Sequence, residues 1–224
     1  VPDDYATIQD AIGNVSAGDT IILRSGHTNE GLITIDKQLT VRGENRYNSI
    51  LDGMGGDDVV RIYASGVVFS DLTINNCTDD GIYVSNSDNI LLEDCVIDSN
   101  VHDGIYVYNS DNSTINNCEV YNCTYYGVQV STSNNLTIIN SEIYEADYLG
   151  IYIDNCRDVL MSNIDIHHNF GGINLWTSLN VTLRDSHIYN QTGTYDGVSF
   201  QSTDRVTVYN CDIYNNQVYD ALEL

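Results

Sequence analysis

Positively charged residues are scarce in this sequence. Lysine and arginine together number 8 against 32 aspartates and glutamates, Lys37 is the single lysine, and the formal net charge is −24. A surface of this sign repels the phosphates of nucleic acids and the headgroups of anionic membranes. We therefore expect no nucleic-acid partner, and an acidic coat that suits a cell surface or a salty milieu.

Long apolar runs are also missing. No stretch is long enough to span a bilayer, and the chain starts with Val1 and Pro2 rather than with methionine. Both features are typical of a secreted protein whose signal peptide has been removed. The sequence thus predicts an extracellular protein that does not insert into a membrane.

What the sequence does have is a repeat. From position 81 onward glycine returns every 22 to 25 residues and opens segments such as GIYV, GVQV and GINL. A unit of this length cannot bury an apolar face by itself, so its copies must stack into a solenoid. The repeating glycines are Gly81, Gly104, Gly127, Gly150, Gly172 and Gly197.

Apolar residues alternate within each unit, which is the period of a β-strand, and three short strands fit in one unit. Like residues then fall in columns from unit to unit, as in a parallel β-helix. Asparagine and aspartate mark the corners, because they tolerate the left-handed backbone of a sharp bend. One inward column reads Ile82, Ile105, Val128, Ile151, Ile173 and Val198, and one corner column reads Asp94, Asn117, Asn140, Asn163, Asp185 and Asn210.

The pattern predicts one all-β domain over residues 1–224 with about nine coils of ~23 residues. Residues 1–17 should cap the N-terminal end, with a short amphipathic helix in DDYATIQDAI, and residues 18–57 should form irregular first coils. Regular coils follow over 58–219, and 220–224 should begin an incomplete coil. An uncapped C-terminal end would leave open strand edges, which are templates for pairing with another chain.

These segments resemble a known superfamily. ATIQDAI, GDTIIL, LTVRGEN and ILDG, followed by the GIYV…N…I…C-x-I unit, are similar to the pectin-lyase-like right-handed parallel β-helix proteins, in particular NosD-type and carbohydrate-binding repeat proteins of archaeal cell surfaces and sheaths. The resemblance covers essentially the whole chain and implies a right-handed coil. It does not fix the function, because this fold carries lyases, hydrolases, epimerases, adhesins and scaffolding.

Acidic residues collect in the turn that leads into the first strand of three successive units. Carboxylates one turn apart repel one another unless some are protonated or bind a cation. The resemblance implies a polysaccharide cleft at such a place, and it makes Asp79, Asp80, His102, Asp103 and Arg61 the candidate catalytic set. Asp58, Asp80 and Asp103 are the candidate calcium ligands, and no other cofactor is expected.

Two features speak against catalysis. The strings Arg-x-Lys and Arg-x-Pro-x-x-Arg of hydrolases and lyases of this fold are absent from the chain. Aspartate before glycine, as at Asp80 and Asp103, is also ordinary turn chemistry.

Aromatic residues form two outward rows. They suit sugar rings or a neighbouring subunit, and the alternative is ring stacking that only stabilises the strands. His167 belongs to the second row and His168 follows it, but neighbours on a strand point to opposite faces, so we expect no metal between them. The contact residues predicted are Tyr125, Tyr148, Phe170 and Tyr195 in one row, and Tyr121, Tyr144, Tyr189 and Tyr214 in the other.

The six cysteines lack zinc-site spacing. Cys95 and Cys118 are neighbours in one inward column, close enough for an intramolecular disulfide, and Cys211 in the same column is a candidate for a cross-link to another chain. Buried thiols that fill core positions are the alternative reading. Among the Asn-x-Ser/Thr sequons, Asn14 and Asn190 are the most accessible candidates for glycosylation.

Three functions remain open at this point. We favour a structural cell-envelope protein, a surface-layer or sheath subunit that assembles with itself through strand edges and tyrosine rows and is reinforced by disulfides. The alternative is an enzyme that acts on acidic polysaccharide as a hydrolase, lyase or uronate epimerase. A non-catalytic carbohydrate-binding module of a larger surface protein is the third.

Overall fold

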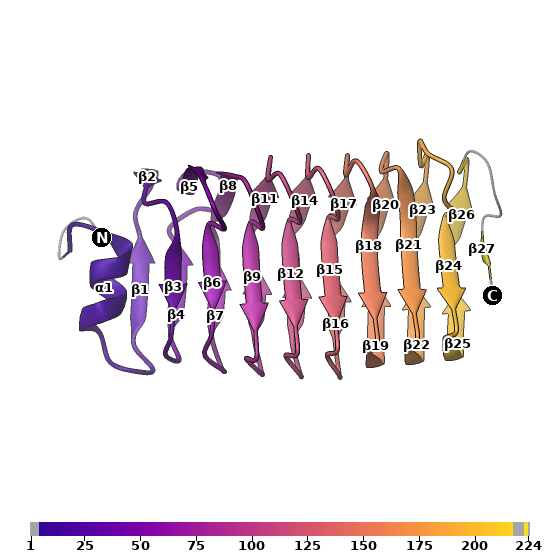
Figure 1. The fold of residues 1–224 in the computed structure, drawn as a ribbon, viewed down its shortest axis with the longest axis horizontal. Helices are drawn as coiled ribbons and strands as arrows, with labels where there is room; N and C mark the ends of the chain where they lie inside the picture. Colours follow the sequence, from indigo (N-terminus) through magenta and orange to yellow (C-terminus); the bar gives the residue numbers. More distant parts are fainter. Residues whose placement is uncertain (1–4, 217–221, 224) are drawn as a thin grey trace.

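The chain forms a column of stacked turns, each built from three short strands (Figure 1). The structure is a computed structural model that describes residues 5–216 and 222–223, with only the backbone of 27–29 and 222–223. Strands at equivalent positions of successive turns pair in parallel, which gives three sheets of nine strands along the column. The fold predicted from the repeat, a single-domain parallel β-helix, is confirmed.

The sheets take their strands in rotation. The first sheet holds β1 (Thr20–Leu23), β4 (Thr40–Gly43), β7 (Val68–Ser70), β10 (Leu91–Glu93), β13 (Thr114–Asn116), β16 (Thr137–Ile139), β19 (Arg157–Ser162), β22 (Leu179–Arg184) and β25 (Asp204–Tyr209). The second holds β2 (Gly26–Asn29), β5 (Ser49–Gly56), β8 (Thr73–Cys77), β11 (Val96–Asp98), β14 (Glu119–Tyr121), β17 (Glu142–Tyr144), β20 (Asp165–His167), β23 (His187–Tyr189) and β26 (Asp212–Tyr214). The third holds β3 (Ile33–Ile35), β6 (Val60–Ile62), β9 (Ile82–Ser85), β12 (Ile105–Tyr108), β15 (Val128–Ser131), β18 (Leu149–Asp154), β21 (Gly171–Trp176), β24 (Val198–Gln201) and β27 (Leu222–Glu223).

The register of the third sheet reproduces the predicted inward column. Ile82 pairs with Ile105, Ile105 with Val128, and the pairing continues in the same register to Val198. All of these side chains are buried, and they face the columns of the other two sheets across one continuous core. The predicted start of a further coil at 220–224 falls partly outside the described residues. In the described part, Leu222 pairs with Val198.

Left-handed backbone marks the corners. Every residue of the column from Asp94 to Asn210 has a φ between 51° and 55°. Amides of this column hydrogen-bond from turn to turn, as where Asn163 Nδ2 donates to Asn140 Oδ1 at 2.9 Å. The sequence did not single out the corner between the second and third sheets, which is left-handed as well. Its column consists of Asn76, Ser99, Asn122, Glu145, His168, Asn190 and Asn215.

A short helix, α1 (Ile8–Asn14), lies against the first turn at one end of the column (Figure 1). It starts later than predicted, because the Thr7 hydroxyl caps it by accepting a hydrogen bond from the Asp10 N–H. Ile8, Ala11 and Ile12 are buried as expected. Gln9 exchanges two hydrogen bonds with the backbone of Thr34 and so covers the edge of β3. Among the described residues, no helix is long and apolar enough to cross a membrane.

The predicted disulfide between Cys95 and Cys118 is absent, and all six cysteines are thiols. Both side chains are inside the column, and each Sγ is directed at a backbone carbonyl of the preceding turn, Phe69 O for Cys95 and Leu92 O for Cys118. Closeness of the two Cα atoms is therefore not enough to form the bond, which also requires the two Sγ atoms to meet at the bond length and dihedral angle of a disulfide. Cys211 is partly exposed, and its intermolecular cross-link stays a prediction.

Candidate active site

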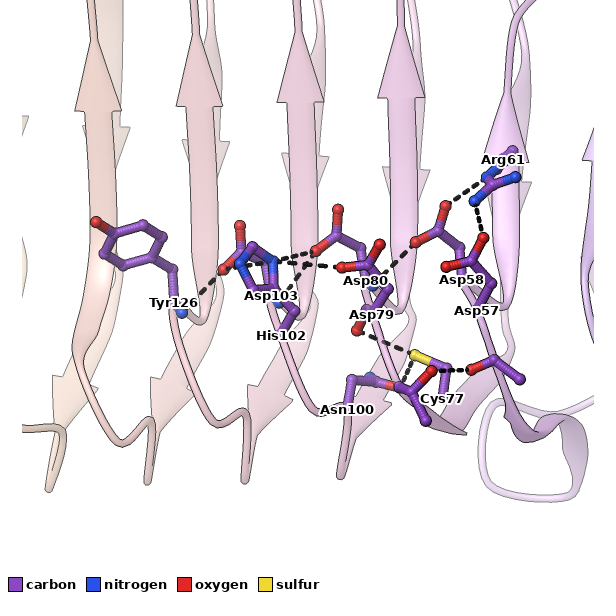
Figure 2. Close-up of polar contacts among 12 residues, drawn as sticks. Asp57, Asp58, Arg61, Cys77, Asp79, Asp80, Asn100, His102, Asp103 and Tyr126 are labelled. Carbon is purple, nitrogen blue, oxygen red and sulfur yellow. Dashed lines mark hydrogen bonds and ion pairs between the residues drawn. The ribbon is translucent and has the colours of Figure 1, made fainter.

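Three aspartates just before β6, β9 and β12 form a buried ladder (Figure 2). Asp58, Asp80 and Asp103 occupy equivalent positions on successive turns and are at most 5% exposed. The Oδ1 of each accepts the backbone N–H of the equivalent residue one turn on, which is Asp80 for Asp58, Asp103 for Asp80 and Tyr126 for Asp103. These carboxyls therefore stabilise the turns, and Asp58 and Asp80 also line a cavity.

The residues just before them form a second, more exposed column. Asp57 and Asp79 stand on the first two turns and His102 on the third. His102 Nδ1 lies 2.8 Å from Asp80 Oδ1, 3.7 Å from Asp79 Oδ1 and 3.6 Å from Asp103 Oδ1. Arg61, on β6, pairs with both Asp57 and Asp58. The structure thus brings the whole predicted catalytic set together (Figure 2).

Burial changes the protonation of this cluster. Desolvation raises the pKa of Asp80 to about 6, and desolvation together with the charge of Asp80 raises the pKa of Asp103 to about 7. The pKa of Asp79 is raised too, by desolvation and then by the charge of Asp58. Burial of the His102 ring would lower its pKa, but the hydrogen bond to Asp80 and the charge of Asp103 outweigh that effect and raise it. Near neutral pH the cluster therefore holds exchangeable protons, as acid–base catalysis requires.

A cavity of about 350 Å³ opens over this cluster. Asp79, Asp80 and His102 line it together with Asp58 and Arg61. The remaining wall is aromatic and consists of Tyr63, Tyr83 and Tyr106. Tyr63 was missed in the sequence, although it follows Arg61 by two residues and so lies on the same outward side of β6. Acidic groups beside tyrosine rings make a cavity that suits a sugar.

The first aromatic row continues from His102 along the column. The ring of His102 stacks on Tyr125, with 5.1 Å between the centroids, and Tyr125 stacks on Tyr148 at the same distance. Phe170 follows, and Tyr195 stands edge-on to Tyr148 with 2.5 Å between the two hydroxyl oxygens. Stacked rings cover each other's faces, so the row offers mostly ring edges to a ligand.

The second row is a ladder on the outer face of the second sheet. Its rings, Tyr121, Tyr144, His167, Tyr189 and Tyr214, stack with 4.9 to 5.2 Å between centroids. Polar atoms of the row are engaged as well, since the Tyr144 hydroxyl donates to Glu119 at 2.8 Å. The ladder therefore matches the stabilising alternative better than the sugar platform.

A larger cavity, of about 480 Å³, lies at the corner between the first and second sheets. Arg46 reaches it from the loop before β5, where its guanidinium donates to Asn117 O and Glu119 Oε2. Two of the carboxylates that line this cavity already have partners. Glu119 binds Arg46 and Tyr144, and Glu142 contacts His167. Because two of the three carboxylates that line this cavity, Glu119 and Glu142 beside Asp165, are engaged in this way, we do not place the active site there.

The carboxylates fit calcium poorly as they stand. Asp57, Asp58 and Asp79 offer oxygens within 4.8 Å of one another, but Arg61 already pairs with two of them. The second close group, Asp79, Asp80 and His102, includes an imidazole, whereas Ca²⁺ prefers oxygen ligands alone. In the predicted set of Asp58, Asp80 and Asp103, every Oδ1 is hydrogen-bonded to backbone. We therefore derive no step through calcium.

The glycosylation candidates differ in their surroundings. Asn14 is exposed at the end of α1, where its Nδ2 donates to Asp10 O. Asn190 is half-buried in the left-handed corner column. Glycosylation of either residue stays a prediction.

The three stacked parallel sheets are the architecture of the right-handed parallel β-helix proteins. The family described as the right-handed beta helix region matches residues 3–145 and 126–222, so the chain belongs to that family. No curated protein sequence matches the chain significantly.

Solved structures with a similar fold include an enzymatically active tailspike domain, a pectate lyase and a DFA-IIIase. The enzymatically active domain of tailspike protein 2 from bacteriophage CBA120 is 13% identical, with a TM-score of 0.68 over 90% of this chain and 40% of its own. Pectate lyase Pel9A is 14% identical, with a TM-score of 0.67 over 93% and 73%. DFA-IIIase from Arthrobacter chlorophenolicus A6 without its lid is 12% identical, with a TM-score of 0.62 over 81% and 60%. At such identities the likeness shows the fold alone, and this chain spans less than half of the tailspike domain.

Proposed function

We propose that the protein is an enzyme that cleaves a glycosidic bond of a polysaccharide with Asp79, Asp80 and His102. The observation that carries this proposal is the pairing of a buried carboxyl, Asp80, whose pKa of about 6 lets it hold a proton, with the more exposed Asp79 in one cavity. The similar fold of an enzymatically active tailspike domain supports an enzyme, and the similar fold of a pectate lyase supports a polysaccharide as the substrate class.

Each residue has a distinct part in this mechanism. Asp80 Oδ1 is held by the Asp103 N–H and by His102, so Oδ2 is the oxygen that carries the proton. Asp80 donates this proton to the leaving sugar oxygen while a carboxylate oxygen of Asp79 bonds to the anomeric carbon. Water then releases the sugar from Asp79, and Asp80 takes up the proton of that water. His102 orients Asp80 and is a positioning residue.

The two carboxyls are close neighbours, as this order of steps requires. Ligand atoms of Asp79 and Asp80 lie within 4.8 Å of each other. Enzymes that form a glycosyl intermediate keep their carboxyls about 5–5.5 Å apart, whereas those that use water directly need about 6.5–9.5 Å. The wall of Tyr63, Tyr83 and Tyr106 would hold the sugar against the acids.

The test is a screen for new reducing ends on polygalacturonate, alginate and a set of neutral glycans. We expect turnover by the wild type, a loss of at least about 100-fold in Asp80→Asn, and unchanged turnover in Asp88→Asn. Asp88 is an exposed carboxylate on the same turn and is the matched control. Turnover that survives in Asp80→Asn would overturn the assignment.

The same screen separates the other uronate reactions. An unsaturated product that absorbs in the ultraviolet would indicate a lyase, and a changed uronate composition without cleavage would indicate an epimerase. Glycan binding without turnover would indicate a carbohydrate-binding module. Each of these results would contradict the hydrolytic mechanism while keeping the cavity as the site.

The self-assembling envelope protein ranks second. Self-assembly requires an open last coil and tyrosine rings that are free to contact another chain. The last coil lies partly outside the described residues, and the rings of the tyrosine rows mostly face each other. Light scattering and electron microscopy with and without reductant test it. Ordered assemblies that loosen on reduction would favour the envelope role over the enzyme. Detection of the protein in the culture medium or on the cell surface would test the extracellular location.

A further inference from the structure

The cavity over the catalytic cluster has more acidic than basic groups on its walls. Its charged and titratable lining residues are three carboxyls, one guanidinium and one imidazole, those of Asp58, Asp79, Asp80, Arg61 and His102. In the described part of the chain, none of the other lysines and arginines lines this cavity. The formal net charge of the chain, −24, has the same sign. A polysaccharide that enters the cavity therefore meets a negative potential.

The positive charge of Arg61 is already paired (Figure 2). Its Nε donates to Asp58 Oδ2, and its Nη2 donates to Asp57 Oδ2. Two carboxylates beside one guanidinium leave this group of three side chains with a negative net charge. A carboxylate of an acidic sugar is held best by an arginine that can turn its donors toward it. At Arg61 such a carboxylate would compete with Asp57 and Asp58 for the same charge.

The carboxyls of the cluster also act on one another. Desolvation raises the pKa of Asp79, and the charge of Asp58 raises it further. Desolvation and the charge of Asp80 act in the same way on the pKa of Asp103. A sugar carboxylate in the cavity would raise the pKa of Asp79 again. Because Asp79 must be ionised to bond to the anomeric carbon, an acidic sugar would work against the proposed reaction.

The tyrosine wall of the cavity is uncharged and open to a sugar ring. Tyr63 and Tyr83 meet edge to face, with 6.3 Å between centroids and 85° between the planes, and Tyr83 and Tyr106 are tilted by 47°. These rings do not lie flat on one another, and Tyr63 is 46% exposed. Ring faces pack against the C–H groups of a sugar, and carboxylates accept hydrogen bonds from its hydroxyls. The wall and the acids together therefore match an uncharged sugar.

We propose that the substrate is an uncharged polysaccharide, and that Asp57 sets this preference by neutralising Arg61. The proposal rests on the proposed function, because it concerns the substrate of the same cavity. An acidic polysaccharide, the substrate class considered from the sequence, is the competing one. Like charges brought together in a binding site weaken binding and so reject the wrong partner.

The test compares two forms of one glycan that differ in charge. The glycan that the wild type turns over best is converted into its partner, by oxidation of primary hydroxyls to carboxylates if it is neutral, or by reduction of carboxylates if it is acidic. We expect kcat/KM to be at least about 10-fold higher for the uncharged form. Added salt should narrow the difference, because it screens repulsion, whereas an enzyme that holds uronates through cations would lose affinity for them.

Asp57→Asn tests the part of Asp57. Its side chain is 58% exposed and does not line the cavity, so the variant should fold and cleave the uncharged form as the wild type does. With one partner of Arg61 gone, kcat/KM for the charged form should rise about 3- to 10-fold. Asp88→Asn is the matched control, because it removes the same charge from an exposed residue beyond the other end of β9. It should change neither value.

The possible outcomes separate this proposal from the proposed cleavage. If the charged form is the better substrate, with or without added calcium, the preference is overturned and the cleavage stands. If nothing is turned over, affinity electrophoresis compares the matched forms of every glycan in the screen. Tighter binding of the uncharged forms would then keep the preference while the cleavage fails, and no binding at all would overturn both. Equal responses of Asp57→Asn and Asp88→Asn would overturn the part of Asp57.

Discussion

Glycine recurs once per turn because a side chain has no room at that position. A Cβ on Gly104 would lie 2.7 Å from the backbone oxygen of Gly127 on the next turn and would also meet the Val120 side chain. The backbone of Gly104 is not left-handed, so space rather than conformation selects the residue. Because each turn approaches the next this closely at one position, glycine recurs in the sequence once per turn.

Gly104→Ala should therefore destabilise the protein by about 1–3 kcal/mol, the usual cost of overpacking a core. The midpoint of urea unfolding measures this. Gly13→Ala is the control, because Gly13 lies in α1 with nothing near the added Cβ, and alanine there should be neutral or stabilising by up to ~1 kcal/mol. Equal effects of the two substitutions would contradict the packing argument.

Asp103 makes stability depend on pH. It is fully buried, and desolvation with the charge of Asp80 raises its pKa from 3.8 to about 7. A group with a raised pKa in the folded state favours folding fully below its unfolded pKa, and this contribution is lost as pH rises through the folded pKa. The protein should therefore lose stability between about pH 4 and pH 7 on account of Asp103, by an amount on the order of a few kcal/mol.

Asp103→Asn tests this reasoning, because asparagine keeps the oxygen that accepts the Tyr126 N–H but cannot ionise. Urea midpoints at pH 4.5 and 7.5 should differ less in the variant than in the wild type, and the variant should be the more stable protein at pH 7.5. If both proteins show the same pH profile, Asp103 is ionised in the folded state without penalty.

At the scale of elements, the tyrosine ladder ties neighbouring strands together. Tyr121 on β14 and Tyr144 on β17 stack almost in parallel, with 4.9 Å between centroids and 2° between the planes. A double-mutant cycle with Tyr121→Leu and Tyr144→Leu should give a coupling of about 0.5–1.5 kcal/mol in urea unfolding. Tyr121 and Tyr214 belong to the same ladder but do not touch, so their cycle should give a coupling below about 0.5 kcal/mol.

The columns of equivalent residues on successive turns could be predicted from the sequence, because membership of a column depends only on a residue's position within the repeat. The inward column at Ile82, the corner column at Asp94 and the meeting of Asp79, Asp80 and His102 all follow from the same spacing. The sequence could not predict side-chain directions at irregular corners. A left-handed residue sends His168 toward His167, and neither residue type announces it.

Contacts that cross several turns were equally hidden. Arg46 leaves an irregular early loop and meets Glu119 on β14, 73 residues away. The repeat gives no register for such a loop, so nothing in the sequence connects the two residues. For the cysteine pair, the repeat predicts the neighbouring positions of Cys95 and Cys118. It does not predict the direction of either Sγ, and each Sγ is directed at a backbone carbonyl.

At the scale of the whole molecule, the reactivity of the thiols measures how well the interior of the column is shielded from solvent. Cys77, Cys95, Cys118, Cys123 and Cys156 are buried, and Cys211 alone of the six is partly exposed. Burial also raises the pKa of Cys211, which keeps most of its thiol protonated near neutral pH. The molecule should therefore react with a thiol reagent slowly and at one position.

We expect one cysteine to react with Ellman's reagent in the native protein and six in urea, with Cys211→Ser removing the native reaction. The column should also elute as a monomer of the 24.9 kDa chain whether or not reductant is present. Four reactive thiols in urea would instead mean that Cys95 and Cys118 are joined after all. If the native protein has no reactive thiol and elutes as a dimer until it is reduced, Cys211 forms a cross-link between chains. That result would favour the envelope role over the enzyme.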